Sequence, residues 1–237
     1  MDLQIIRHRM INNKFTILIP DRSTDSQIEK NVFGEKYNII CSNALSLSEI
    51  SNELWSKCDG MLVWHDFNYS KSIIKKLANC KGIVRIGTGY DNVDLEEAAK
   101  QKIVVSNVPD YGTNDVADHT MALILSLERG IVLFNNAIKN KAPWTWELGK
   151  NLERIQNKKL GIIGFGRIGS AVALRAKSFG MDVGFFDPNV PIGIEKSFNI
   201  SRSHNMQNLL SESDIISIHT SLNPSTDGMV DKIFFDL

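Results

Sequence analysis

The chain has 237 residues, of which 43% are hydrophobic, so it is long enough to bury the cores of one or two domains. Its 27 basic and 27 acidic side chains balance, which argues against nucleic acid or an anionic membrane as a general partner. Apolar runs such as Met121–Leu127 are far shorter than a membrane span, so no transmembrane segment is expected.

The three cysteines, Cys41, Cys58 and Cys80, are widely spaced and form no C-x-x-C pair. This pattern is typical of free thiols in a reducing compartment and not of a disulfide framework or a metal site. Residues 1–10 carry charges but no apolar core of signal-peptide length. We therefore predict a cytoplasmic protein without a metal, whose translation starts at Met1 or at Met10.

In the first half of the chain, short apolar strands alternate with helical patterns. This alternation predicts βαβ units and a parallel sheet that helices cover on both faces. The five strands make a complete small doubly wound domain by about residue 107. The predicted strands are Phe15–Ile19, Tyr37–Cys41, Met61–Trp64, Ile83–Ile86 and Ile103–Val105, and the helices are Asp25–Val32, Leu47–Lys57, Ser70–Ala78 and Leu95–Gln101.

The loop after the fourth predicted strand contains Arg85 and two glycines, Gly87 and Gly89. Ligands of open parallel sheets bind outside the carboxyl ends of the strands, where this loop is expected. The glycine N–H groups could hold a carboxylate, and Arg85 could pair with it bidentately. The alternative is a plain turn in which Asp91 and Asn92 cap the next helix, and the sequence leaves both readings open.

A long helix is predicted over about 113–128, after the break at 109–112. Thr113 suits its N-cap, and Asp115 suits the positive end of its dipole. Residues 140–158 lack a clear period and indicate a connection with Trp144 and Trp146 as anchors. The helix carries an apolar stripe that predicts core packing: Val116, Ala117, Thr120, Met121, Leu123, Ile124 and Leu127.

A glycine motif with G-x-G-x-x-G spacing follows the predicted strand Leu160–Ile163 and precedes a helix over 170–179. Gly164 permits a tight turn, Gly166 lets the backbone approach a pyrophosphate, and Gly169 lets the helix pack closely on the strand. The helix N-terminus offers N–H groups and a positive dipole end to phosphates. The order strand, glycines, helix favours dinucleotide binding over a plain structural βαβ turn.

The next predicted strand, Asp182–Phe186, ends at Asp187, eighteen residues after Gly169. A carboxylate here is placed to bind the ribose 2′-hydroxyl of NAD. The residues at 188–190 include no cation for a 2′-phosphate, so we predict NAD rather than NADP. Further elements are predicted near Phe198–Ile200, as a helix at Met206–Ser211 and as a strand at Ile215–His219.

Four blocks of this sequence together resemble the D-isomer-specific 2-hydroxyacid dehydrogenases, and most closely the subgroup of the NAD(H)-binding C-terminal binding proteins, which are transcriptional corepressors. The blocks are RIGTGYDNVD at 85–94, NVPDYGTNDVADHT at 107–120, LGIIGFGRIG at 160–169 and SDIISIHTSLNPST at 213–226. The resemblance runs from about Phe15 to the end. It implies an α/β protein with two doubly wound parallel-sheet domains: a flavodoxin-like substrate domain over 1–107 and a Rossmann NAD-binding domain over 108–237.

The resemblance also implies the roles of individual residues. The substrate carboxylate and the nicotinamide end would meet Arg85, Thr88 and Gly89. His119 and His219 are not expected to be catalytic. His119 lies beside the hinge, on the hinge helix over about 113–128, where packing or solvation is expected, and His219 is a neighbour of the cofactor. The expected cofactor-binding residues are Thr120, Gly164, Phe165, Gly166, Arg167, Ile168, Gly169, Asp187, His219, Thr220 and Asn223.

In the resembled family, the catalytic Arg, Glu and His lie downstream of the block that ends at Thr226, so none is expected in this chain. A dinucleotide domain has about six strands, whereas the sequence predicts three or four, and we therefore expect an incomplete second domain that is not active by itself.

The leading hypothesis is an NAD-dependent oxidoreductase that interconverts a small 2-oxo acid and a D-2-hydroxy acid. We expect a homodimer in the full-length form. The alternatives are an NAD(H)-sensing corepressor-like binding protein and an inactive fragment.

Overall fold

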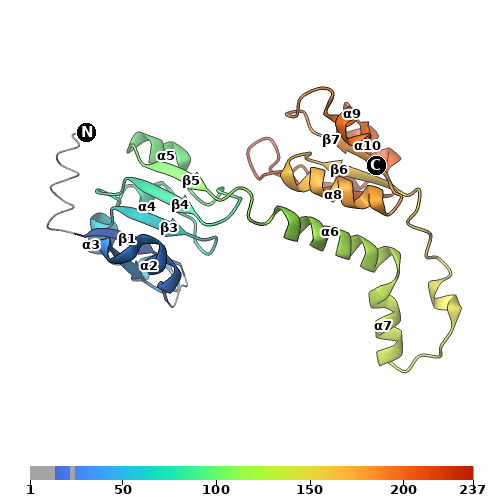
Figure 1. The fold of residues 1–237 in the computed structure, drawn as a ribbon, viewed down its shortest axis with the longest axis horizontal. Helices are drawn as coiled ribbons and strands as arrows, with labels where there is room; N and C mark the ends of the chain where they lie inside the picture. The colour runs from blue at the N-terminus through green and yellow to red at the C-terminus, as the bar shows by residue number, and fades with distance from the viewer. Residues whose placement is uncertain (1–13, 22–24, 237) are drawn as a thin grey trace. The chain divides into compact units, whose positions relative to one another are not determined.

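The computed structural model describes residues 14–21 and 25–236. The chain divides into two compact units, Met1–Tyr111 and Gly112–Leu237, each with its own parallel sheet (Figure 1). The boundary predicted from the sequence lies between residues 107 and 108. The two alternative starts, Met1 and Met10, lie outside the described residues.

The sheet of the first unit has the strand order β2-β1-β3-β4-β5, and every strand pair in it is parallel. This is the order of flavodoxin-like folds, so the predicted fold is confirmed. The strands are β1 (Phe15–Ile19), β2 (Tyr37–Cys41), β3 (Gly60–Val63), β4 (Gly82–Arg85) and β5 (Val104–Asn107), and the helices are α2 (Gln27–Phe33), α3 (Asn52–Lys57), α4 (Lys71–Ile74) and α5 (Leu95–Lys100), with the 3-10 turns η1 (Gly34–Lys36) and η2 (Leu47–Glu49).

One predicted helix of this unit is divided in the structure. The segment predicted as Leu47–Lys57 forms η2 and then α3, because Ser51 is extended and its side chain accepts the N–H of Leu54. A serine that caps an N-terminus starts a new helix rather than continuing an old one. The helix predicted to reach residue 78 ends at Ile74.

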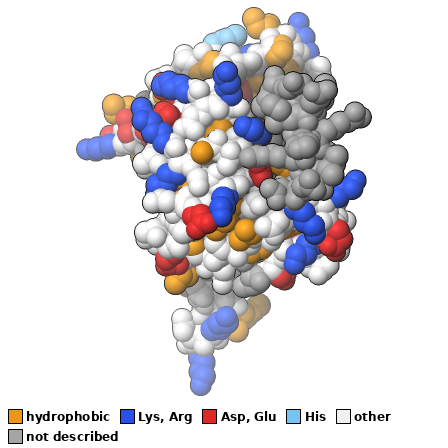
Figure 2. Space-filling view, turned by 90° about the vertical axis from the view of Figure 1, so that its left-hand side faces the viewer, with side chains coloured by type: hydrophobic (Ala, Val, Ile, Leu, Met, Phe, Trp, Pro, Cys, Tyr) orange, Lys and Arg blue, Asp and Glu red, His pale blue; other side chains and the backbone are white. Residues whose placement is uncertain are grey.

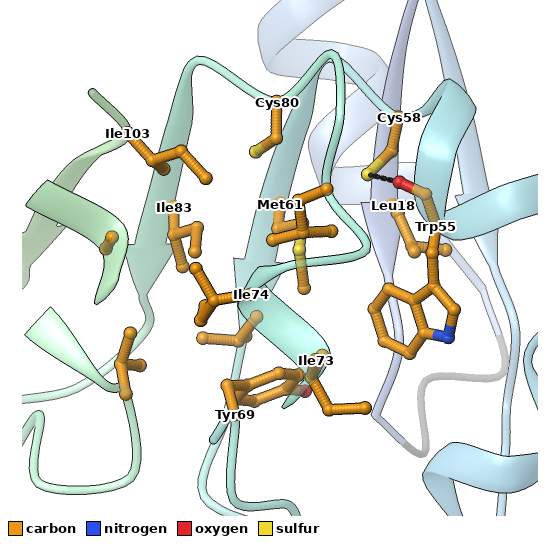
Figure 3. Close-up of a cluster of buried hydrophobic side chains, with 14 of the residues drawn as sticks. Leu18, Trp55, Cys58, Met61, Tyr69, Ile73, Ile74, Cys80, Ile83 and Ile103 are labelled. Carbon is orange, nitrogen blue, oxygen red and sulfur yellow. Dashed lines mark hydrogen bonds between the residues drawn. The ribbon is translucent and has the colours of Figure 1, made fainter. Parts of the chain in front are cut away.

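The core of the first unit gathers large side chains from β3, β4, α3 and α4 (Figure 3). Trp55, Tyr69 and Ile74 are fully buried. Cys58 and Cys80 belong to the same cluster as free thiols, and the Cys58 thiol donates to the carbonyl oxygen of Trp55 at 3.2 Å. Burial of these apolar side chains is the main stabilising contribution to this unit.

A buried carboxylate joins the carboxyl ends of two strands. Asp21, which follows β1, is 1% exposed, and its Oδ2 accepts the N–H of Trp64 at 3.0 Å and the hydroxyl of Tyr69 at 2.8 Å. Burial, together with the charge of Asp21, raises the pKa of Tyr69, so the phenol remains a donor. These bonds fix the loop after β3 against the end of β1.

The sheet of the second unit has the order β8-β7-β6-β9, and all its pairs are parallel. From the central strand β6 the chain continues to β7 on one side and later returns to β9 on the other, which makes a topological switch point. The strands are β6 (Lys159–Ile163), β7 (Asp182–Phe186), β8 (Ser201–Arg202) and β9 (Ile215–Ile218), and the helices are α6 (Thr113–Glu128), α7 (Ile131–Lys139), α8 (Arg167–Ser178), α9 (Ile194–Phe198), α10 (Met206–Glu212) and α11 (Lys232–Phe235), with η3 (Trp146–Gly149).

Only one side of the apolar stripe on α6 is buried. Ala117, Met121 and Ile124 belong to the core that α6 shares with α8, as the predicted packing requires. The other side is exposed, with Leu123 at 54% and Leu127 at 75%. The prediction that the whole stripe packs in the core is therefore wrong for this second side.

Helix α6 begins at Thr113 with Gly112 at the N-cap, so the prediction of Thr113 as the N-cap is wrong by one residue. No single described helix is long and apolar enough to cross a membrane. The helices α6 and α7 pass that test only as a pair, and they meet at a bend of 60°. On the face drawn in Figure 2, basic and acidic side chains are interspersed, which agrees with the balanced charge.

Replacing Tyr69 by Phe should lower the free energy of unfolding of the first unit by about 1–2 kcal/mol, because Asp21 loses a buried hydrogen bond. Urea titration followed by tryptophan emission measures this change, because the buried Trp55 of this unit becomes exposed on unfolding. Tyr90→Phe is the control, because Tyr90 is 46% exposed. Equal effects of the two substitutions would contradict a stabilising role of the Asp21–Tyr69 bond.

Candidate functional site

A cavity of about 460 Å³ lies at the carboxyl ends of β6, β7 and β9. This is the switch point of the sheet, where doubly wound folds bind their ligands. Several residues predicted to bind the cofactor line it: Gly164, Gly166, Asp187, His219, Thr220 and Asn223.

Two glycines bring β6 and α8 into close contact at this cavity. Gly164 has φ +89°, and a Cβ there would lie 2.7 Å from the carbonyl oxygen of His219. A Cβ on Gly169 would lie 2.1 Å from the carbonyl oxygen of Gly164. No larger residue fits either position without moving backbone, so both glycines have the packing roles that the spacing predicts.

Gly166 differs, because a Cβ there would meet no atom within 4 Å. It is the N-cap of α8 and lines the cavity. The first N–H groups of a helix have no partner within the helix and attract anions. The open space over Gly166 beside this helix end fits the pyrophosphate of a dinucleotide.

Two backbone N–H groups hold the carboxylate of Asp187. Its Oδ2 accepts the N–H of Phe165 at 2.8 Å, and its Oδ1 accepts the N–H of Asn189 at 2.8 Å. Each carboxylate oxygen can accept a further bond, so Asp187 can still bind ribose hydroxyls. The same bonds connect the glycine turn to the end of β7.

Other predicted cofactor residues do not line the cavity. The ring of Phe165 stacks on Phe185 in the core, with centroids 4.1 Å apart, and its backbone N–H binds Asp187. Arg167 is exposed at the first position of α8, and Ile168 packs against the core. The hydroxyl of Thr120 donates to the carbonyl of Val116 within α6 at 2.8 Å. Their cofactor contacts remain predictions.

The loop after β9 forms one wall of the cavity. The Oγ of Ser217 lies 2.8 Å from Nε2 of His219, and burial lowers the pKa of His219, which favours a neutral imidazole. Oδ1 of Asn223 accepts the N–H of Ser225 at 2.9 Å and its hydroxyl at 2.6 Å. Asn223 therefore shapes this loop as an Asx turn in addition to lining the cavity.

Part of the lining of the cavity was not predicted from the sequence. Ser225 and Thr226 belong to the last of the four blocks, which could have indicated them. Met206 comes from α10, and no local pattern connects it to the glycine motif. The remaining residues that were not predicted are Ile163, Phe186, Pro188, Asn189, Ser221 and Met229.

In the first unit, the Arg85 side chain folds over Gly87. A Cβ on Gly87 would lie 1.6 Å from Nη1 of Arg85, and that nitrogen donates weakly to the carbonyl of Ile86 at 3.3 Å. Nε of Arg85 is buried and has no hydrogen-bond partner among the described residues. Thr88 and Gly89 are exposed. The carboxylate-binding role of these residues remains a prediction.

The alternative prediction, in which Asp91 and Asn92 cap the next helix, names the wrong residues. Asp94 caps α5 by accepting the N–H of Glu97 at 2.9 Å. Asn92 instead donates to the carbonyls of Trp64 and Phe67, at 2.9 and 2.8 Å, and so joins the loops after β3 and β4. The cap lies two residues after Asn92, because Asp94 directly precedes the first helical residue.

The part of the chain that the structure describes holds no group of three or more His, Cys, Asp or Glu side chains that could bind a metal ion.

Gly166→Ala and Gly169→Ala should separate cofactor binding from folding. The Gly169 variant should lose about 1–3 kcal/mol of stability or more, because its Cβ overlaps a carbonyl. The Gly166 variant should melt like the parent chain but bind NADH about tenfold more weakly, because its methyl group enters the cavity. Thermal melts and NADH fluorescence titrations measure both quantities. Unchanged NADH affinity in Gly166→Ala would contradict the pyrophosphate position.

The fold is similar to that of solved dehydrogenases. D-lactate dehydrogenase from Aquifex aeolicus, solved with NAD and lactic acid, matches with a TM-score of 0.84 at 24% identity over 93% of this chain and 65% of its own. The acyclic imino acid reductase Bsp5, solved with NADPH and D-Arg, matches with a TM-score of 0.81 at 25% identity over 93% of this chain and 70% of its own.

Two curated relatives are similar in sequence. D-3-phosphoglycerate dehydrogenase of Bacillus subtilis (strain 168) is 33% identical over 92% of this chain, and C-terminal-binding protein 1 of Caenorhabditis elegans is 31% identical over 87% of it. The chain spans 40% and 29% of the lengths of these two proteins.

The family match covers nearly the whole second unit. Residues 121–237 match the D-isomer specific 2-hydroxyacid dehydrogenase family in its NAD binding domain. This range contains the glycine motif, Asp187 and the loop after β9 that surround the cavity. The second unit of the chain is therefore an NAD binding domain of the D-isomer specific 2-hydroxyacid dehydrogenase family.

Proposed function

We propose that this chain supplies the NAD-binding and substrate-binding parts of an oxidoreductase that interconverts a 2-oxo acid and a D-2-hydroxy acid. The observation that carries the proposal is the cavity at the switch point, where open space over Gly166 adjoins the fixed carboxylate of Asp187. The family match over this unit supports it.

The residues around the cavity would hold the two halves of NAD in different ways. The N-terminus of α8 would bind the pyrophosphate, and Asp187 would accept hydrogen bonds from the adenosine ribose. His219, Thr220 and Asn223 would contact the cofactor from the loop after β9. When bound, NADH supplies the hydride, while these residues fix its position and exclude water.

Arg85 is the residue that we assign to the substrate carboxylate. Its buried Nε is unpaired among the described residues and its Nη1 bond to Ile86 is long, so the guanidinium has donors to spare. A guanidinium and a carboxylate form two parallel, charge-assisted hydrogen bonds. The reaction also needs a cation at the carbonyl oxygen and a proton donor, and we assign neither role to His119 or His219.

Arg85→Ala should lower kcat/KM for 2-oxo acids about tenfold or more, because a charge-assisted pair contributes about 1.5–3 kcal/mol. The assay follows NADH oxidation with a panel of 2-oxo acids in the longest polypeptide that the gene encodes. NADH affinity should stay constant, and Arg154→Ala controls for the loss of a guanidinium from another part of the chain. An unaltered kcat/KM in the Arg85→Ala variant would contradict the assignment of Arg85 to the substrate carboxylate.

A second candidate function is an NAD(H)-sensing binding protein, which the 31% identity to C-terminal-binding protein 1 favours. The same assay separates the two functions. Tight NADH binding without turnover of any 2-oxo acid by the longest polypeptide would support the binding protein, whereas turnover supports the enzyme.

We also propose that the protein forms a homodimer through the apolar surface of α7 and residues 140–148. The two tryptophans that were expected to anchor this segment are exposed, Trp144 by 91% and Trp146 by 78%. Ile131, Val132 and Ile138 of α7 are also more than half exposed. Exposed apolar side chains that lie together often mark an interaction surface, and a second copy of the same surface is its simplest cover.

Trp144→Glu should therefore convert a dimer into a monomer, because a carboxylate would be buried unpaired in the interface. Sedimentation velocity measures the change. Ile192→Glu is the control, because Ile192 is 92% exposed but lies outside the apolar surface. A dimer that withstands Trp144→Glu would contradict this interface, and a monomeric parent chain would contradict the dimer itself.

A further inference from the structure

One guanidinium binds three backbone carbonyls of a single loop in the second unit. Arg202 of β8 donates from Nη2 to the carbonyl oxygens of Asp187 and Val190, at 3.0 and 2.9 Å. Its Nη1 donates to the carbonyl oxygen of Pro191 at 2.9 Å. The guanidinium of Arg202 therefore holds the loop over residues 187–191, which follows β7, at three of its carbonyl groups.

Further contacts fix the orientation of this guanidinium. The Arg202 side chain is 12% exposed, and its central carbon lies 5.5 Å from the centroid of the Phe185 ring. Oε2 of Glu195 lies 3.6 Å from Nη1, and both carboxylate oxygens of Glu195 accept the N–H of Gly193 at 3.1 Å. Packing against Phe185 and the ion pair with Glu195 together restrict the orientation of the planar group.

The other face of the same loop borders the cofactor cavity, which Asp187, Pro188 and Asn189 line. Arg202 is not among the residues that line this cavity, so it acts on the site through the loop. A cation this close to Asp187 would favour NADP if its donors were free to bind a 2′-phosphate. Three of its five N–H donors, including both on Nη2, are instead occupied by carbonyl oxygens that belong to the loop itself.

We propose that Arg202 is the positioning residue for NAD selectivity: it holds the 187–191 loop so that the carboxylate of Asp187 faces the ribose 2′-hydroxyl. This inference rests on the proposed function, because it concerns the same cofactor site. The role differs from direct binding, since Arg202 contacts the loop and Asp187 contacts the ribose.

Loss of Arg202 leaves the loop with several conformations, and only some of them place Asp187 correctly. When the competent conformation is populated one tenth of the time, the apparent Kd rises about tenfold. NADH depends on the bond to Asp187, whereas NADPH meets the same carboxylate with its 2′-phosphate and gains nothing from its placement. The Kd for NADH should therefore rise more than the Kd for NADPH.

The experiment compares the 237-residue chain with Arg202→Met, Arg202→Lys and Lys177→Met. Lys177 is a matched control, because its ammonium group also donates to two carbonyls, those of Phe198 and Asn199, but not to the 187–191 loop. NADH, NADPH and AMP are titrated with each variant, and AMP isolates the adenosine end of the site. Hydrogen exchange of the amides over 187–193 is measured without ligand, and thermal melts establish that each variant is folded.

Arg202→Met should weaken NADH and AMP binding about tenfold, narrow the NADH-to-NADPH affinity ratio, and speed exchange over 187–193 but not in β6. Arg202→Lys should still weaken NADH several-fold, because one ammonium cannot reproduce the planar fork, and Lys177→Met should change neither affinity. Equal weakening of NADH and NADPH, or an Arg202→Lys chain that binds like the parent, would overturn the positioning role. Absence of NADH binding by the parent chain would overturn the proposed function itself.

Discussion

The second unit depends on the close approach of α8 to the end of β6. A side chain on Gly169 would overlap the carbonyl of Gly164, and one on Gly164 would overlap His219 at the end of β9. These contacts place the N-terminus of α8 directly over the switch point, with Gly166 facing open space. Steric exclusion therefore positions a helix end that is able to bind an anion.

Asp187 connects this helix end to the selectivity of the site. The carboxylate accepts one N–H from the glycine turn and one from its own loop, so both segments adopt a fixed relation to each other. The same carboxylate is expected to bind the ribose. A substitution of Asp187 would therefore remove the link between the two segments and the bond to the ribose together. A substitution of Arg202 tests the support of the loop separately from the bond to the ribose, since Arg202 holds the loop without lining the cavity.

Sequence patterns predicted most strands to within a residue or two, and the glycine spacing predicted the turn at Gly164, because these features depend on local apolar runs and backbone sterics. Patterns failed where distant segments meet. The exposed half of the apolar stripe on α6 was predicted to lie in the core, because periodicity does not show which side of a helix packs against another element. The contact of Arg202 with the 187–191 loop could not be predicted from the sequence. Its partners lie eleven to fifteen residues earlier and accept the hydrogen bonds through backbone carbonyls, which no residue type marks.

The two units fix their candidate binding loops by the same physical means. In the first unit Asn92 donates to the carbonyls of Trp64 and Phe67, and in the second unit Arg202 donates to three carbonyls of the 187–191 loop. Bonds to carbonyl oxygens hold a loop whatever side chains it carries. The side chains that face a ligand are then free to differ, so one scaffold can hold different acids or cofactors while its loops keep their shape.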